Sequence, residues 1–353
     1  MCQKSLSPTF ANIDHPRFPS TKFMGSKRKL IPFLFSVLDK IHYDTVLDAF
    51  SGSGCVGFEF KRKGKAVTTN DFLHYSYLLS KALIENNNFK IDKLTLDDII
   101  KFREDAPSTV KDLYADIFFT PEECSFLDSL RLNIEEKLQN PYLKALAISA
   151  ACRACQKKRP RGIFTFTGRK SWDSRKDLKM SMENQFEKAV SELNEAVFDN
   201  GKINKAECSD IITLSDNDFD LVYMDPPYWS PLSDNDYVRR YHFLEGYSLQ
   251  WKGLDIDMST KVRKFKSYKT PFSNLEEARK SLEKLFQRYS NSIIVLSYSS
   301  NGFPTKEELC SMLSSVKKKV TFYEKGHRYS FGNQGNKVGT TKNLVKEYVI
   351  VGE

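Results

Sequence analysis

Four consecutive residues, Asp225-Pro226-Pro227-Tyr228, have the clearest chemical potential in this chain of 353 residues. They follow the apolar run 221–224, which is typical of a buried strand, so the motif stands at a strand end. The two prolines hold the backbone extended and lack N–H donors, so a main-chain carbonyl beside the Asp225 carboxylate is left to accept hydrogen bonds. These two acceptors match the two N–H groups of a planar amine, and the Tyr228 ring can stack on the heterocycle that carries it. The motif therefore predicts a site that binds an exocyclic amine and makes its nitrogen nucleophilic.

A turn of small residues, 48–54 (DAFSGSG), ends another predicted strand, 45–50. Glycines let the backbone approach a ligand closely, and the helix that follows offers free N–H groups at its start. Asn70-Asp71 ends the next predicted strand, 66–71, where an acidic side chain can accept both hydroxyls of a ribose. Each signal alone also fits a plain tight turn or a helix N-cap. Together they favour an adenosine-containing cofactor.

Positive charge is concentrated between residues 151 and 180. This segment contains ten Lys and Arg residues against Asp173 and Asp177, a net charge of +8, while the whole chain carries +9. Charge concentrated in this way is typical of a docking face for a polyanion. The centre of the segment, 162–168 (GIFTFTG), alternates apolar and hydroxyl side chains between glycines, which predicts a strand or hairpin.

A hairpin can enter a DNA groove, so the segment is expected to make two kinds of contact. We expect Arg159 and Arg161 to reach base edges, and Lys157 and Lys158 to meet phosphates. The alternative is that all four meet phosphates or solvent, because phosphate and sugar take half or more of protein–DNA hydrogen bonds.

Two further basic stretches follow the Asp-Pro-Pro-Tyr motif. Residues 237–246 (YVRRYHFLEG) fit either a loop that closes over an extruded base or binds phosphate, or an ordinary surface helix. Residues 261–269 contain five Lys and Arg residues and no acidic residue, which fits phosphate contact or a solvated run of charge.

Composition narrows the class of protein. Hydrophobic residues make up 40% of the chain and charged residues 28%, so a wholly disordered or collagen-like chain is excluded. The chain has no apolar run of about 18 residues that could span a membrane and no signal-peptide pattern at its start, so we expect a cytoplasmic protein. Seven scattered cysteines argue against a disulfide framework. Cys152 and Cys155 lack a second pair of ligands nearby, so we expect ordinary thiols and no metal site.

Short β-rich runs alternate with helical stretches in both end portions of the chain. Strands are expected at 45–50, 66–71, 203–208, 219–224, 292–297, 316–325 and 347–351. Helices are expected at 30–41, 56–63, 74–86, 94–102, 121–138, 142–155, 178–198 and 275–289. This order predicts an α/β fold with a mostly parallel sheet. The sheet domain, residues 1–88 and 200–353, is expected to be interrupted by a mainly helical DNA-binding insertion at 89–199 that contains the β-hairpin.

These motifs, in this order, resemble the Dam-like D12 class of DNA adenine-N6 methyltransferases, in the α-group arrangement that places the cofactor motifs first. Phe23-Met24-Gly25-Ser26-Lys27 resembles the N-terminal motif of that class, and DAFSGSG resembles its S-adenosylmethionine motif. Asp71 matches the ribose-binding position, and Cys208-Ser209-Asp210 stands where the class usually has Gly-Asp-Phe. Residues 225–228 match the catalytic motif, and 161–168 resemble the DNA-reading hairpin, with Thr165 in place of a common Asn.

The resemblance implies a Rossmann-like methyltransferase sheet. It also implies transfer of a methyl group from S-adenosylmethionine to N6 of adenine in double-stranded DNA, with the target base extruded from the stack. The enzyme would be the site-specific modification enzyme of a restriction–modification system, and its cognate restriction endonuclease need not form a stable complex with it. The alternatives are N4 of cytosine, adenine in RNA, or a DNA-binding homologue without activity.

The resemblance also assigns roles to residues. Asp225 and the Pro226 carbonyl would bind the target amine and Tyr228 would stack on the base, with Pro227 completing the catalytic motif. Lys27 would lie near a carboxylate, although 27–29 also fits a solvated basic turn. The implied cofactor-binding residues are Phe23, Met24, Gly25, Lys27, Asp48, Ala49, Phe50, Ser51, Gly52, Gly54, Asp71, Ser209, Asp210 and Asp225. The expected DNA-binding residues are Lys157, Lys158, Arg159, Arg161, Thr165, Arg169, Lys170, Arg239 and Arg240.

Overall fold

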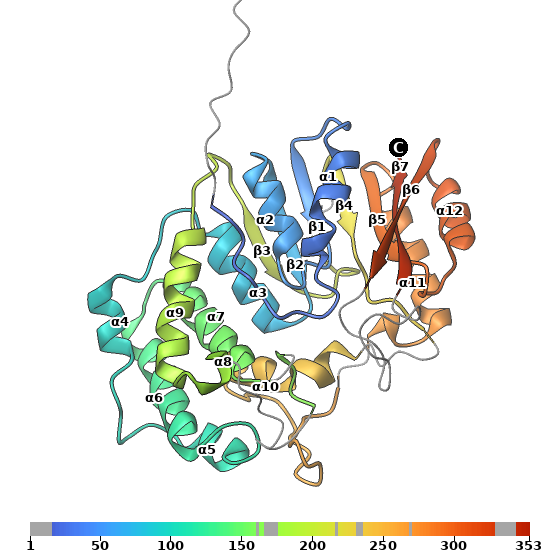
Figure 1. The fold of residues 1–353 in the computed structure, drawn as a ribbon. Coiled ribbons are helices and arrows are strands. Elements are labelled where there is room, and N and C mark those ends of the chain that lie inside the picture. The colour runs from blue at the N-terminus through green and yellow to red at the C-terminus, as the bar shows by residue number, and fades with distance from the viewer. Residues whose placement is uncertain are drawn as a thin grey trace, which may run out of the picture.

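One sheet of seven strands runs through the protein in the order β3-β2-β1-β4-β5-β7-β6 (Figure 1). The computed structural model describes residues 16–159, 162–165, 176–215, 218–230, 236–267, 270–328 and 344–353. The strands are β1 (Thr45–Asp48), β2 (Ala66–Asp71), β3 (Lys205–Cys208), β4 (Leu221–Met224), β5 (Ile293–Ser299), β6 (Val320–Arg328) and β7 (Leu344–Gly352). Each strand expected from the sequence is present, with its ends moved by four residues or fewer.

The sheet is mostly parallel, and its strand order reverses next to β1. Strand β1 pairs in parallel with β2 and β4, and the pairs β2–β3 and β4–β5 are also parallel. Strand β7 runs antiparallel to β5 and β6. In open α/β sheets a ligand binds outside the carboxyl ends of the strands, where the order reverses. Asp48 ends β1 and Asp225 follows β4, so both predicted motifs lie at this point.

Alternate residues of the buried strands pack into two apolar layers on opposite faces of the sheet. Val46 and Tyr223 belong to one layer, and Leu47 and Val222 belong to the other. The first layer includes α1 (Ile31–Leu38), α2 (Cys55–Arg62) and α3 (His74–Ser80), and the second includes α11 (Leu275–Arg288) and α12 (Lys306–Ser314). Burial on both faces explains why these strands read as continuous apolar runs in the sequence.

A helical half lies to the lower left of the sheet in Figure 1. Its helices are α4 (Lys93–Ile99), α5 (Thr109–Tyr114), α6 (Pro121–Lys137), α7 (Pro141–Lys157), α8 (Lys176–Lys179), α9 (Met182–Ala196) and α10 (Tyr237–Leu249). Helix α10 follows β4 in the sequence, yet it packs against α7 and α3. The apolar layer beside α1–α3 continues into these helices without a break. The sheet and the helical half therefore share one core.

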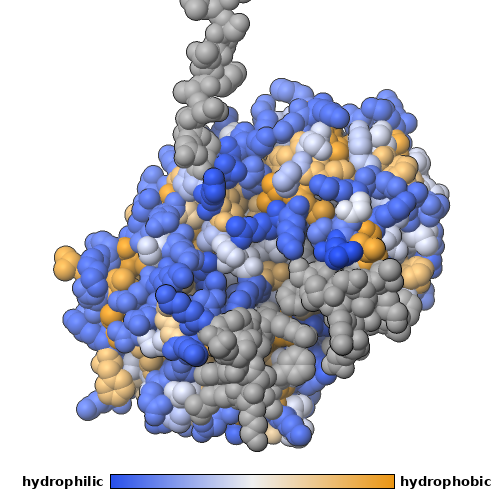
Figure 2. Space-filling model, viewed as in Figure 1, coloured by the Kyte–Doolittle hydropathy of each residue, from blue (hydrophilic) through white to orange (hydrophobic). Residues whose placement is uncertain are grey.

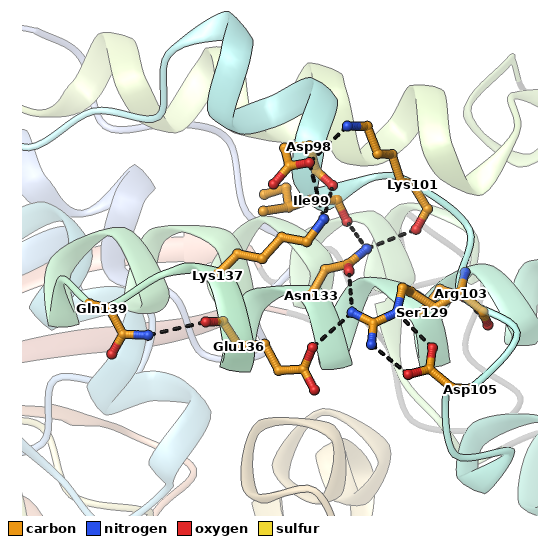
Figure 3. Close-up of polar contacts among 10 residues, drawn as sticks. All are labelled: Asp98, Ile99, Lys101, Arg103, Asp105, Ser129, Asn133, Glu136, Lys137 and Gln139. Carbon is orange, nitrogen blue, oxygen red and sulfur yellow. Dashed lines mark hydrogen bonds and ion pairs between the residues drawn. The ribbon is translucent and has the colours of Figure 1, made fainter.

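Polar contacts hold the loop after α4 against α6 (Figure 3). The Asn133 side-chain amide donates to the carbonyls of Ile99 (2.9 Å) and Lys101 (2.8 Å), which satisfies backbone acceptors at the end of α4. The Arg103 guanidinium forms ion pairs with Asp105 (2.6 Å) and with Glu136 of α6 (2.8 Å). These contacts fix the outer corner of the helical half.

The expected hairpin at 162–168 is described only over 162–165. Phe164 is fully buried, and its N–H donates to the Arg240 carbonyl (3.0 Å) while its own carbonyl contacts His242 Nε2 (3.0 Å). No strand is assigned within 162–165, and residues 166–168 lie outside the described residues. The described part of this segment is therefore bound to α10 rather than projecting as a strand.

The face of the molecule shown in Figure 2 is mostly hydrophilic, with apolar residues in separate patches. None of the helices in the described ranges is long and apolar enough to cross a bilayer. Cys152 and Cys155 are buried free thiols within α7. Across the described residues, no cluster of His, Cys, Asp and Glu is arranged to hold a metal ion.

Candidate active site

A cavity of about 490 Å³ opens at the carboxyl ends of β1 and β4, where the strand order reverses. Its lining brings together most of the residues that the sequence assigned to a cofactor or to catalysis. These are Phe23, Met24, Gly25, Lys27, Asp48, Ala49, Phe50, Ser51, Gly52, Asp71, Ser209, Asp210, Asp225 and Pro227. Gly54, Pro226 and Tyr228 lie beside the cavity without lining it.

Asp225, Tyr228 and Lys27 form a tight polar triangle at one end of this cavity. The Tyr228 hydroxyl donates to Asp225 Oδ1 (2.6 Å), and Lys27 Nζ lies 2.9 Å from the same oxygen and 2.6 Å from that hydroxyl. The Tyr228 ring packs against Tyr298, with ring centroids 4.4 Å apart. Oδ1 of Asp225 is therefore engaged by protein groups, whereas Oδ2 has no hydrogen-bond partner among the described residues and can accept from a ligand.

Lys27 is 4% exposed, so it is not part of a solvated basic turn. Its ammonium lies between Asp225 and Glu347 of β7, whose Oε2 is 3.9 Å away. A buried ammonium is stable only when anions and acceptors surround it. The carboxylates near Lys27 thus include the catalytic candidate itself.

The glycine-rich turn after β1 is fastened to the end of β2 through Asp71. The Gly52 N–H donates to Asp71 Oδ2 (2.6 Å) and the Leu73 N–H donates to Oδ1 (2.8 Å). Gly52 and Gly54 have φ values of +51° and +76°, in the left-handed region that favours glycine. Burial raises the pKa of Asp71 to about 6, against the lowering effect of these N–H donors.

Asp48 lies deeper in the same cavity and is 1% exposed. Its Oδ2 accepts from the Gly57 N–H (3.0 Å), while Oδ1 is buried without a hydrogen-bond partner among the described residues. Burial, together with the nearby charge of Asp225, raises the pKa of Asp48 to about 8. Such a group favours a ligand that brings positive charge into the cavity.

Aromatic rings from α10 support the N-terminal wall of the cavity. The Phe23 ring stacks on Tyr241 (centroids 5.2 Å) and on Tyr237 (6.0 Å). The Met24 N–H donates to the Tyr241 hydroxyl (2.8 Å). Gly25 has φ +72°, and a Cβ there would lie 2.9 Å from the Tyr237 hydroxyl oxygen. Residues 237–246 thus belong to a mostly buried helix, which differs from both the loop and the surface helix considered for them.

Several lining residues were missed by sequence reasoning. Ser26, Phe72, Ile211, Trp229, Ser230, Asp236, Tyr237, Ser267 and residues 270–273 also face the cavity. Ser26 lies inside a recognised motif, and Tyr237 and Ser267 lie inside the two basic stretches, although none of the three was given a role. Phe72, Ile211, Trp229, Ser230 and Asp236 flank a recognised motif or stretch by one or two residues, which is the only signal that could have found them. Residues 270–273 directly follow the basic stretch 261–269, but nothing in that stretch predicts a cavity wall.

Ser209 and Asp210 lie at the end of β3, on the far side of β2. The Ser209 N–H and hydroxyl both contact Asn70 Oδ1, at 3.2 and 3.0 Å. Asp210 is exposed at the rim, where its Oδ1 accepts from the Ile212 N–H (3.0 Å). Asn70 therefore positions this strand end, and Asp210 keeps a carboxylate oxygen toward solvent.

Comparison with protein families decides the class. The sequence model of the D12 class N6 adenine-specific DNA methyltransferases matches residues 23–312, which include every residue that lines the cavity. The chain belongs to this family.

Individual relatives extend the similarity. The Type II methyltransferase M2.HphI of Haemophilus parahaemolyticus is 32% identical over 351 residues, covering 94% of this chain and 98% of that protein. M.FokI of Planomicrobium okeanokoites is 27% identical over 83% of this chain, which spans 47% of that protein. The modification methylase StsI of Streptococcus sanguinis is 28% identical over the same share of this chain, which spans 46% of it.

The basic residues of this D12 methyltransferase are placed unevenly. Lys157 is partly exposed and lies 3.5 Å from Asp177, and Thr165 is partly exposed. Arg239 is exposed at the start of α10, and the half-buried Arg240 contacts the Met24 sulfur (3.2 Å). Arg161, Arg169 and Lys170 lie outside the described residues.

Lys158 and Arg159 point into the helical half of the D12 enzyme. Lys158 is 3% exposed, pairs with Glu123 (2.7 Å) and donates to the carbonyl of Met180 (2.7 Å). Arg159 is 1% exposed, its guanidinium lies 4.9 Å from the Phe118 ring centroid, and burial lowers its pKa to about 10. The apolar stems and charged groups of both side chains pack in the interior. Lys158 and Arg159 are therefore not exposed to DNA in this structure, and the other expected DNA-binding residues remain as candidates.

Proposed function

We propose that this chain transfers the methyl group of S-adenosylmethionine directly to N6 of an adenine in double-stranded DNA. One observation carries the proposal. The Asp225 carboxylate and the glycine-rich turn held by Asp71 open onto the same cavity of about 490 Å³. A donor and an acceptor bound in one cavity can react without an enzyme-bound intermediate.

The cavity residues fit S-adenosylmethionine. Asp71 would accept the ribose hydroxyls, the N–H groups of the glycine-rich turn would face the methionine portion, and Asp210 would bond the adenine amine. The sulfonium of the cofactor supplies an electrophilic methyl group. Asp48 is buried with an unsatisfied Oδ1 and has a raised pKa, so the positive charge of a bound sulfonium would favour its ionised form and be favoured by it.

The target adenine must leave the base stack to reach Asp225. Asp225 Oδ1 is held by Tyr228 and Lys27, so Oδ2 and the Pro226 carbonyl would accept the two N6–H bonds. These bonds draw the amine nitrogen toward tetrahedral geometry and make its lone pair available to the methyl carbon. The N6–C bond would form as the methyl carbon–sulfur bond breaks, which leaves a neutral thioether. The surplus N6 proton would pass to the Asp225 carboxylate and from there to water. Catalysis rests on positioning and electrostatics.

The biological role follows from the relatives. M2.HphI, M.FokI and StsI are named as Type II methyltransferases or modification methylases. We infer that this chain is the modification enzyme of a restriction–modification system, acting at one DNA site that a restriction endonuclease encoded nearby also cuts. Because such an enzyme must reach the DNA of its own cell, we also infer that it acts in the cytoplasm.

The test is methyl incorporation from labelled S-adenosylmethionine into unmodified bacteriophage DNA, followed by mapping of the modified bases. We expect N6-methyladenine at one short sequence and no label with the Asp225→Ala variant. Label on cytosine would overturn the choice of base, and label on RNA alone would overturn the choice of nucleic acid. Duplex binding without any incorporation would favour a DNA-binding homologue that has lost activity.

A further inference from the structure

The basic stretch that follows α10 folds into a short hairpin, residues 255–267. Ile256 and Phe265 form an antiparallel bridge, and the Asp257 N–H donates to the Lys264 carbonyl (2.8 Å). The turn is closed by the Thr260 N–H, which donates to the Asp257 carbonyl (3.2 Å). This 255–267 hairpin is the light-orange loop that extends at the bottom of Figure 1.

The hairpin is fixed to the helical half. The Tyr114 hydroxyl donates to the Arg263 carbonyl (3.0 Å), and the Arg263 guanidinium donates to the carbonyls of Asp112 and of Leu113 (2.7 Å). These carbonyls end α5, where a cation is favoured by the helix dipole. Phe265 is 2% exposed. The Arg263 charge therefore serves to anchor the hairpin, and the tip is presented on a rigid base.

The base of the hairpin is part of the cavity rim. Ser267 lines the cavity, and its hydroxyl donates to Asp236 Oδ2 (2.6 Å). Asp236 also lines the cavity and caps α10, since its Oδ1 accepts from the Arg239 N–H (2.8 Å). The hairpin thus leaves the protein at the entrance through which an extruded base would pass.

Charge at the tip is not compensated as it is at the base. Lys266 pairs with Asp255 (3.0 Å), and the Ser259 hydrogen bond together with the charges of Lys264 and Lys266 lowers the pKa of Asp257. Lys261 is exposed and forms no ion pair with the part of the chain that the structure describes. Met258, beside it, is 60% exposed. A solvated run of charge would require neither the rigid anchor nor the position at the rim.

We propose that the 255–267 hairpin contacts the sugar–phosphate backbone of the duplex beside the extruded adenine, with the Lys261 ammonium on a phosphate. This proposal rests on the proposed function, because it takes the cavity as the site that receives the base. Duplex DNA carries one negative charge for about every 1.7 Å of its axis, so a cation at the cavity entrance meets phosphate whatever the sequence. The hairpin therefore raises affinity for all sequences alike and leaves the choice of site to other residues.

The experiment compares Lys261→Glu and Lys261→Ala with Lys93→Glu and Lys93→Ala. Lys93 is also exposed, on α4 at the far corner of the helical half, where it pairs with Asp97. Binding of a fluorescent duplex of random sequence is measured by anisotropy across a salt series. We expect Lys261→Ala to weaken binding about five- to tenfold near 0.1 M salt and to lower the salt slope by about one unit. Lys261→Arg should retain wild-type binding.

Steady-state methylation gives a second readout. We expect the Lys261 variants to raise KM for bacteriophage DNA with kcat and S-adenosylmethionine affinity unchanged. Equal salt slopes and KM values for the Lys261 and Lys93 variants would overturn the proposal. Failure of the proposed function can be told apart from failure of the hairpin proposal. A wild-type protein that transfers no methyl group would overturn the proposed function, while the duplex-binding measurements would still test the hairpin. A change in kcat alone would also contradict a phosphate contact.

Discussion

Replacing Asp71 by Asn tests whether one carboxylate both organises the glycine-rich turn and binds the cofactor. Both oxygens of Asp71 accept backbone N–H groups, from Gly52 at 2.6 Å and from Leu73 at 2.8 Å. An amide keeps only one acceptor oxygen, so its NH2 group would face the second N–H donor. Each hydrogen bond to a charged group contributes about 1.5–3 kcal/mol. We therefore expect Asp71→Asn to weaken S-adenosylmethionine binding by more than tenfold at pH 8, which is about 1.4 kcal/mol or more.

The affinity for S-adenosylmethionine should also depend on pH, and the titration of Asp71 gives the direction of the change. The pKa of Asp71 is raised to about 6 by burial, and the proposed hydrogen bonds from two ribose hydroxyls need its ionised form as acceptor. Protonation below pH 6 removes that acceptor, so wild-type affinity should fall about tenfold between pH 8 and pH 5. Asp48, whose pKa is raised to about 8, faces the same cavity and titrates in both proteins. Since the Asp71 charge is only a minor cause of the raised Asp48 pKa, the ratio of the two dissociation constants at each pH removes most of the Asp48 contribution.

Isothermal titration calorimetry with S-adenosylmethionine from pH 5 to pH 9 measures both effects. Circular dichroism at each pH checks that both proteins remain folded. The reasoning is refuted if the folded Asn variant binds as tightly as wild type at pH 8, or if the ratio of the dissociation constants stays constant across the acid range. Asp71→Ala serves as a second variant, since it lacks both acceptors and should bind no better than Asn.

Three further substitutions separate catalysis, interior packing and the cavity wall. Asp225→Ala should keep less than a tenth of kcat, a loss of more than about 1.4 kcal/mol of barrier lowering, with duplex affinity nearly unchanged by anisotropy; a larger residual kcat would contradict the mechanism. Arg159→Ala should lower the free energy of unfolding in urea by about 2–4 kcal/mol without changing the salt slope of duplex binding, because its guanidinium is buried over Phe118; a changed slope with unchanged stability would return it to the DNA-contacting residues. Gly25→Ala should weaken cofactor binding, because its φ is +72° and the new Cβ would lie 2.9 Å from the Tyr237 hydroxyl oxygen; adding Tyr237→Phe should restore part of the affinity, and calorimetry that finds no coupling between the two positions would exclude this contact.

The sheet and its reversal point could be read from the sequence because both have local signals. Strand β2 (Ala66–Asp71) is observed at the predicted bounds, since a short β-branched run ends in a polar pair. The Asp-Pro-Pro-Tyr motif and the glycine-rich turn each mark the end of a strand. Because β1 and β4 pair in parallel, both motifs lie at the same edge of the sheet. The class of fold therefore followed from residues that lie close together in the chain.

The parts that were missed depend on contacts between distant segments. The sequence shows Lys158 and Arg159 only as charges, while their burial depends on Glu123 and on Phe118, which lie 35 and 41 residues away. The stretch 237–246 looks basic and polar, yet its role comes from Phe23, more than 200 residues earlier. Contacts between residues so far apart in the chain leave no local pattern in the sequence. Counting Lys and Arg along the chain therefore overstated the positive charge on the surface, because Lys158 and Arg159 are buried.

The bond between Phe164 and α10 bears on how new DNA specificities could arise in this enzyme. The Phe164 N–H and carbonyl are both held by α10, and the Phe164 ring stacks on Phe243 with centroids 4.9 Å apart. A transplant of residues 89–199 from a relative would separate the two sides of this contact. A chimaera that also carries residues 237–267 from the same donor would keep them matched. Exchange of recognition sequences between such enzymes is therefore expected to involve two stretches of the gene at once, one on each side of the catalytic motif.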